Sequence, residues 1–189
     1  MRPILLASAS PRRAEILRNA GIDFQVQPAR VDETRLPGEG AVDYVRRLAQ
    51  AKAFALEAGS GDMILAADTT VSLGEEILEK PRDAADARRM LDALAGRRHQ
   101  VITAICLRVA GRFLVDHEVT DVSFLPLTEE EIAAYVASGE PMDKAGAYAI
   151  QGLASRFIDR VEGCYFNVVG LPVSRVWRGL KELSPEISS

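Results

Sequence analysis

Apolar residues along the chain either form short unbroken runs or alternate with polar residues, and both patterns are typical of β-strands. They predict strands at residues 4–7, 24–27, 63–67, 99–109, 113–125 and 157–161. The two longest of these stretches are joined near Gly111, so we expect them to form an antiparallel hairpin.

Between the strands, apolar residues recur at the three- and four-residue spacing that helices require. This spacing predicts helices at residues 11–21, 42–58, 83–95 and 128–136 and a last helix carrying Val176, Leu180 and Leu183. Ser10 followed by Pro11 is a typical helix start, with the serine as N-cap. Thr128 and Glu131 have the spacing of a capping box. Helices and strands that alternate in this way predict an α/β fold.

Composition narrows the class of protein without identifying it. The 189 residues are enough for one domain, or two intimate lobes, with a substantial core, so we expect residues 1–189 to form a single domain. A hydrophobic content of 48% and a charged content of 26% are ordinary for a soluble globular protein. The net charge of −4 argues against general affinity for nucleic acid or for an anionic membrane.

The two cysteines and the N-terminal residues favour a cytoplasmic protein. Cys106 lies inside an apolar run, far from Cys164, so we expect core thiols in a reducing compartment. The N-terminal residues lack the pattern of a signal peptide, and no apolar run approaches the ~20 residues that span a bilayer. His99 and His117 have no partner at metal-ligand spacing, which argues against a structural zinc site.

The first turn of the first helix carries two cations where carboxylates would be favoured. Arg12 and Arg13 follow Pro11, at the end of the helix that is already positive through its macrodipole. A helix N-terminus after a strand is a ready-made anion site, and two guanidinium groups would add donors for phosphate oxygens. The alternative is a pair of solvated arginines with no ligand.

Two further charged residues stand where apolar residues surround them. Lys52 falls on the apolar stripe of the second helix, and it either snorkels to solvent or points inward at an anion. Asp68 directly follows the apolar run 63–67, so we expect it at the carboxyl end of a buried strand. Open α/β sheets place their ligands at such ends, although a turn-capping aspartate would look the same.

Two segments later in the chain add candidates for a binding site. Lys80 precedes a proline, which favours an extended backbone at that lysine. Residues 139–152 combine ionisable and small residues at high density, which suggests a segment that faces a ligand. A solvated connector would have a similar composition.

Five ordered motifs together resemble the Maf family of nucleoside triphosphate pyrophosphatases, once described as septum-formation inhibitors. They lie at residues 8–13 (SASPRR), 67–69 (ADT), 79–81 (EKP), 143–148 (DKAGAY) and 167–172 (NVVGLP). The resemblance extends from Ile4 to about Leu183. It implies an elongated mixed β-sheet flanked by helices, with two lobes and a central cleft, as in inosine triphosphate pyrophosphatase, and a homodimer.

The resemblance also implies a reaction and the residues that carry it. The family cleaves between the α- and β-phosphates of a nucleoside triphosphate with a divalent cation, Mg²⁺ or Mn²⁺. Asp68 matches the carboxylate that accepts a proton from the attacking water, and Glu33 would share the metal with it. The remaining polar residues of the family's site match Ser8, Arg13, Lys52, Lys80 and Lys144.

Three positions at which the family divides by substrate match Arg12, Thr69 and Gln151. These residues resemble the dTTP/UTP branch, whereas the 7-methyl-GTP branch tends to carry Trp, Gln and Glu. A neutral glutamine amide can both donate to and accept from a pyrimidine edge. We therefore expect a cytoplasmic hydrolase of the house-cleaning type, which acts on dTTP, UTP or modified pyrimidine nucleotides.

Two alternatives remain open at this point. One is a pyrophosphatase for 7-methyl-GTP or another non-canonical purine nucleotide. The other is a regulator of cell division that binds nucleotide without hydrolysing it. A kinase or GTPase is disfavoured because no GxxxxGK[ST] segment is present.

Overall fold

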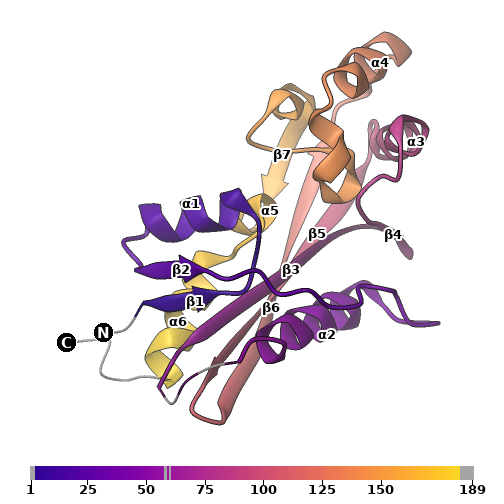
Figure 1. The fold of residues 1–189 in the computed structure, drawn as a ribbon. Coiled ribbons are helices and arrows are strands. Elements are labelled where there is room, and N and C mark those ends of the chain that lie inside the picture. Colours follow the sequence, from indigo (N-terminus) through magenta and orange to yellow (C-terminus); the bar gives the residue numbers. More distant parts are fainter. Residues whose placement is uncertain (1–2, 58, 60, 184–189) are drawn as a thin grey trace. The chain divides into compact units, whose positions relative to one another are not determined.

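A computed structural model describes residues 3–57, 59 and 61–183. Within these residues, a seven-stranded mixed sheet has the strand order β2-β1-β3-β5-β6-β7, with β4 paired to β3 (Figure 1). The strands are β1 (Ile4–Leu6), β2 (Phe24–Val26), β3 (Ile64–Leu73), β4 (Glu76–Leu78), β5 (Arg98–Val109), β6 (Arg112–Phe124) and β7 (Ile158–Glu162). The predicted α/β fold, a mixed sheet flanked by helices, is confirmed; the central cleft stays a prediction.

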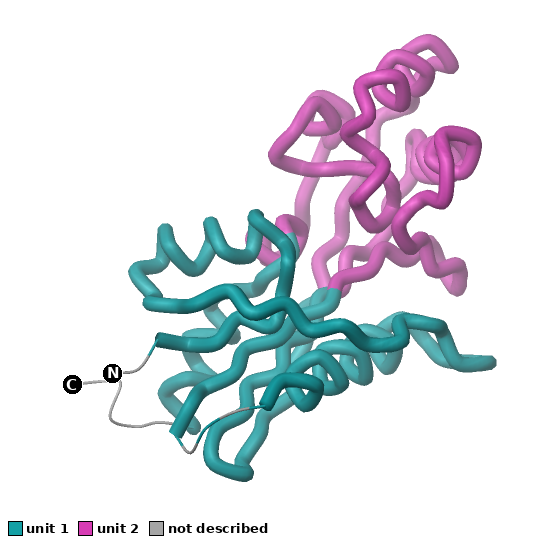
Figure 2. Tube along the Cα trace, viewed as in Figure 1, with its two compact units in different colours: residues 1–68, 103–118, 170–189 teal, residues 69–102, 119–169 magenta. Residues whose placement is uncertain are grey.

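The helices connect these strands. They are α1 (Pro11–Asn19), α2 (Ala41–Phe54), α3 (Ala84–Leu94), α4 (Glu129–Ala137), α5 (Tyr165–Val169) and α6 (Val173–Leu183), with 3₁₀ turns η1 (Glu140–Asp143), η2 (Ala145–Ala147) and η3 (Leu153–Phe157). The chain divides into two compact units, shown in Figure 2. The first comprises residues 1–68, 103–118 and 170–189, and the second comprises residues 69–102 and 119–169.

The first unit is built around β1, which pairs in parallel with both β2 and β3. Parallel strands are buried on both faces, which explains why β1 and the start of β3 read as unbroken apolar runs. Helix α2 buries the predicted stripe that includes Val45, Leu48 and Ala49. Helix α6 packs closely against β5 at Gly179. A Cβ added to this glycine would stand only 2.5 Å from Leu107 Cδ1.

The second unit has its own core. Its buried apolar residues include Leu78, Leu91, Phe124, Tyr135 and Phe157. Antiparallel pairs β3–β4 and β6–β7 supply its strands. The capping box predicted at the start of α4 is confirmed, since both of its reciprocal hydrogen bonds are present.

The side chain of Asn167 ties α5 to two strands of the second unit. Asn167 is fully buried, and its Nδ2 donates to the carbonyl of Val101 and to Thr120 Oγ1, each at 2.9 Å. Thr120 Oγ1 also accepts from the Cys164 amide at 3.0 Å and contacts the Cys164 carbonyl at 3.1 Å. The sequence pattern did not predict α5, which has only five residues.

Two predictions about element boundaries were wrong. Strand β3 does not end at Ala67 but continues to Leu73, because residues 69–73 are rich in strand-forming side chains, and Asp68 therefore lies in mid-strand. Helix α2 ends at Phe54 instead of continuing toward Ala58, which lies outside the described residues. The predicted N-cap position of Ser10 at the start of α1 is confirmed, although its side chain makes no capping hydrogen bond.

The predicted C-terminal tail, residues 184–189, also lies outside the described residues. Among the residues that are described, no helix is both long and apolar enough to cross a bilayer.

Candidate active site

Lys52 brings two carboxylates together in the first unit. It lies in the last turn of α2, and its Nζ is 2.6 Å from Asp68 Oδ1 on β3 and 2.6 Å from Glu33 Oε1. The side chains of Lys52 and Asp68 are each 11% exposed, whereas that of Glu33 is 48% exposed. The Lys52–Asp68 pair is thus shielded from water, which strengthens the attraction, while Glu33 approaches from the solvent side.

Burial makes Asp68 a stronger base than an ordinary aspartate. It raises the pKa of Asp68 above its usual value, because the carboxylate loses hydration. The charge and hydrogen bond of Lys52 and the charge of Arg13 act in the opposite direction, and nearby Glu33 adds to the rise. Asp68 can therefore take up a proton more readily than a solvated carboxylate, while two cations hold its charged form in place.

Arg13 crosslinks three segments of the first unit. Its Nε donates to the Gly170 carbonyl at 2.8 Å, and its Nη1 donates to the Ala67 carbonyl at 2.8 Å and to Ser8 Oγ at 3.1 Å. Burial lowers the pKa of Arg13, although a guanidinium keeps its charge in proteins. Arg13 thus fixes the backbone on the N-terminal side of Asp68 relative to the start of α1.

Ser8 links the same segments from the β1–α1 connection. It is buried, and its Oγ accepts from the Ser10 amide at 3.2 Å as well as from Arg13. Arg12 is half-buried in the first turn of α1. The structure therefore gathers five of the predicted site residues in two adjoining groups, Ser8 with Arg13 and Lys52 with Glu33 and Asp68.

The other predicted residues belong to the second unit. Lys80 and Gln151 are exposed, Lys144 is half-buried, and Lys144 Nζ contacts Asp143 Oδ1 and, at 3.5 Å, the Glu140 carbonyl. Thr69 follows Asp68 on β3, so the two side chains point to opposite faces of the strand. The roles of these residues stay predictions.

The carboxylates predicted to bind a metal are Glu33 and Asp68. Each places an oxygen 2.6 Å from the same ammonium nitrogen, so the two carboxylates converge on one point. The described residues contain no group of three or more His, Cys, Asp or Glu side chains that would hold a metal alone. Mg²⁺ does not need such a cage, because it is commonly held by one or two carboxylates together with substrate phosphates and water.

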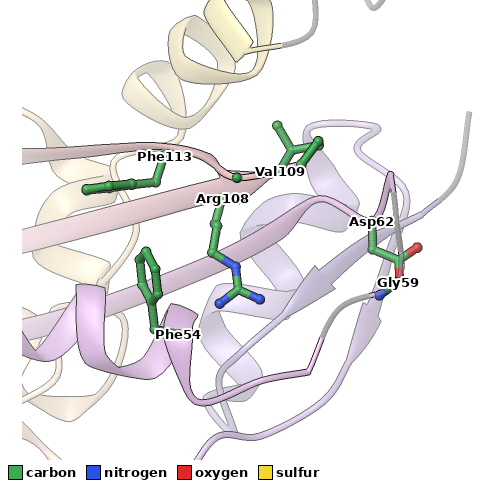
Figure 3. A pocket seen from close by; sticks show the side chains of 8 residues that line it. Phe54, Gly59, Asp62, Arg108, Val109 and Phe113 are labelled. Atoms are coloured by element: carbon green, nitrogen blue, oxygen red, sulfur yellow. The ribbon is translucent and has the colours of Figure 1, made fainter.

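A pocket that sequence reasoning missed lies elsewhere in the first unit (Figure 3). It has a volume of about 380 Å³ and shares no residue with the predicted site. The rings of Phe54 and Phe113 meet edge to face in it at 5.3 Å, and the Arg108 guanidinium lies 4.9 Å from the Phe54 ring. Arg108 also donates to the Leu56 carbonyl at 3.0 Å, so it binds the backbone just after α2.

Comparison with known protein families places this geometry in context. The family described as "Maf-like protein" matches residues 3–183, nearly the whole chain. The chain belongs to the Maf-like family. The resemblance found in the five sequence motifs is thereby confirmed.

Individual relatives of this Maf-like chain carry a more specific name. A "dTTP/UTP pyrophosphatase" of Koribacter versatilis is 49% identical over 179 residues, covering 94% of this chain and 93% of the relative. Another, of Desulforamulus reducens, is 47% identical over 190 residues and covers 99% of this chain and 100% of the relative. Among solved structures, a HAM1 protein from Coxiella burnetii has a TM-score of 0.52 at 17% identity, covering 96% of this chain and 100% of that one. This last likeness concerns the fold alone.

Proposed function

We propose that this Maf-like protein hydrolyses dTTP and UTP to the nucleoside monophosphate and pyrophosphate. The names of its relatives, at about half identity over nearly full length, support the reaction. The observation that carries the proposal is the cluster in which Lys52 holds both Asp68 and Glu33 in a partly buried site. A protein that only binds nucleotide has no need of a desolvated carboxylate beside two cations.

Asp68 is the group that accepts a proton from the attacking water. Its raised pKa brings its basicity closer to that of a working general base, and the 2.6 Å contact with Lys52 keeps its oxygen oriented. Lys52 then stabilises the negative charge that develops on the leaving pyrophosphate, since its ammonium is already in the site.

The start of α1 supplies the phosphate-binding part of the proposal. Ser10 contributes no side-chain cap, so a bound phosphate would supply acceptors for the first-turn amides. Arg12 and Arg13 add positive charge at the same place, with Arg13 oriented by Ser8 and by backbone carbonyls. Phosphoryl transfer depends mainly on stabilising the negative charge of the phosphate oxygens and on aligning the nucleophile.

The donor set fits a divalent cation held by Glu33 and Asp68, with phosphate oxygens and water as further ligands. Both protein ligands are carboxylate oxygens, which hard ions such as Mg²⁺ and Mn²⁺ prefer. When bound, such an ion would neutralise phosphate charge and polarise the phosphoryl group. The half-exposed Glu33 side chain leaves this part of the cluster open to solvent.

The remaining predicted residues complete the proposal. Lys80 and Lys144 contribute positive charge toward the triphosphate, and Arg12, Thr69 and Gln151 select the base. The exposed Gln151 amide suits a pyrimidine edge, to which it can donate and accept. The proposal also includes one domain of two lobes with the site in a cleft, a homodimer, a cytoplasmic location, and neither nucleic acid nor membrane as a partner.

Pyrophosphate release from dTTP, UTP, CTP, 7-methyl-GTP and ITP, each with Mg²⁺ or Mn²⁺, tests the proposal. We expect the highest kcat/KM for dTTP and UTP and no release without a divalent cation. Preference for 7-methyl-GTP or ITP would replace the substrate class with a purine one. Nucleotide binding without release under every condition would indicate a non-catalytic regulator.

A further inference from the structure

The segment that carries Gln151 is anchored on both sides. Ile150 is 9% exposed and Ala154 is fully buried, while Gln151 between them is exposed. A turn bond from the Gly152 amide to the Ala149 carbonyl, at 3.0 Å, closes the backbone beneath Gln151. The amide side chain is therefore presented to solvent from a backbone that is fixed at both ends.

Tyr135 of α4 fixes the beginning of this segment. Its side chain is fully buried, and its hydroxyl accepts from the Ala149 amide at 3.3 Å and donates to Glu140 Oε1 at 2.9 Å. Burial, together with the bond to Glu140, raises the pKa of Tyr135, so the hydroxyl stays protonated and remains a donor.

Glu140 fixes the end of the segment with its second carboxylate oxygen. Oε2 accepts from the Leu153 amide at 3.0 Å, while Oε1 is held by Tyr135. A Cβ at Gly152 would lie 2.3 Å from Oε1, so the carboxylate packs directly on the glycine backbone. One tyrosine hydroxyl and one carboxylate thus bracket Ala149 and Leu153, the residues two positions before and after Gln151.

We infer that Tyr135 and Glu140 are positioning residues that set the base selectivity of the enzyme by holding Gln151 in one place. The inference rests on the proposed function, in which Gln151 reads the base. Neither residue needs to touch the substrate, because each acts on the backbone that presents the amide.

The Glu140→Gln variant tests this role. Glutamine keeps the size of the side chain but removes its charge, and its amide nitrogen cannot accept a hydrogen bond. The variant therefore either loses the Leu153 contact or reverses the bond with the Tyr135 hydroxyl, which no longer meets a charged acceptor. We expect KM for UTP to rise roughly tenfold, the scale of one hydrogen bond to a charged group. We expect kcat to change by less than about twofold, and the ratio of kcat/KM for UTP over 7-methyl-GTP to fall.

Tyr135→Phe provides a second variant, because it removes the hydroxyl and keeps the buried ring. Glu131→Ala is the matched control. Glu131 lies on the same helix and its carboxylate also accepts a backbone N–H, from Thr128 at 2.8 Å, but it has no bond to residues 149–153. Glu131→Ala should lower Tm about as much as Glu140→Gln does, but it should leave the preference for UTP unchanged.

A double-mutant cycle with Gln151→Ala tests whether Glu140 acts through Gln151. If Glu140 acts through Gln151, adding Glu140→Gln to Gln151→Ala causes little further loss of base discrimination. Additive losses, or a change in discrimination in Glu131→Ala, would overturn the inference. Wild-type protein that fails to release pyrophosphate from UTP would instead overturn the proposed function, so the two failures are distinguishable.

Discussion

Arg13 donates a 2.8 Å hydrogen bond to the carbonyl of Ala67, the residue directly before Asp68 in β3. A second bond, from Arg13 Nε to the Gly170 carbonyl, reaches a segment far away in the sequence. The backbone of the proposed base is thus held by one guanidinium, and its side chain is held separately by the ammonium of Lys52.

Replacing Arg13 with lysine should destabilise the protein and reduce its activity. A single ammonium on a flexible chain cannot reproduce the fork that serves Gly170, Ala67 and Ser8 together. An acceptor left without its partner costs about 1–3 kcal/mol, and we expect the free energy of unfolding in urea to fall by that amount. Unchanged stability would show that Arg13 does not crosslink these segments.

Replacing Asp68 with asparagine should remove most turnover and preserve the fold. Asparagine has nearly the same shape but cannot accept the proton of the attacking water. Loss of a general base predicts a decrease in kcat of roughly 10²–10⁴-fold, measured as pyrophosphate release from UTP. The circular dichroism spectrum should match the wild type, and near-normal turnover would exclude Asp68 as the base.

Replacing Lys52 with methionine should increase the thermal stabilisation of the protein by divalent cations. Without the ammonium, the carboxylates of Asp68 and Glu33 face each other with no cation between them. Added Mn²⁺ would relieve this repulsion, so Tm should rise more than in the wild type, by about 2–4 °C for each kcal/mol gained. The same variant with Glu33→Gln serves as control, and an equal response in both would argue against a metal at this position.

Protonation of Asp86 at low pH should lower the free energy of unfolding. Its carboxylate accepts bonds from the Arg82 amide, from Arg82 Nε and from Arg89 Nε, and these bonds lower the pKa of Asp86 to about 2. Because the pKa is lower in the folded state, the stabilisation is present above the ordinary value of 3.8 and is lost as the pH falls toward about 2.

Urea unfolding of wild type and Asp86→Asn across this pH range tests the effect. The wild type should be more stable at neutral pH, and the two curves should converge as the pH approaches about 2. A stability difference that does not depend on pH would show that the charge of Asp86 is not the cause.

The sequence predicted the elements of this fold well because most depend on local signals. The apolar stripe of α2, the capping box of α4 and the loop at Gly111 are each encoded within a few residues. The continuation of β3 through Asp68 was missed because an aspartate after an apolar run is typical of a strand end. In the structure, Lys52 compensates the charge of Asp68 inside the strand, and that partner lies sixteen residues away in the sequence.

The sequence indicated candidate residues for the site but not how they are arranged. The resemblance to the Maf family indicated Arg13, Lys52 and Asp68, yet hydrophobic spacing could not show that Arg13 binds backbone carbonyls of distant segments. The hydrogen bonds by which Tyr135 and Glu140 hold residues 149–153 could not be predicted for a different reason. Tyr135 reads as an ordinary core residue, and only the positions of its hydroxyl and of the Ala149 amide show its second role.

The bond between Arg13 and the Gly170 carbonyl spans 157 positions of the sequence. During translation, the N-terminal strands and α1 therefore leave the ribosome long before the acceptor for this guanidinium has been made. The centre around Asp68 should consequently mature only near the end of synthesis, and nascent chains released before Gly170 should be inactive even when their first helices have formed.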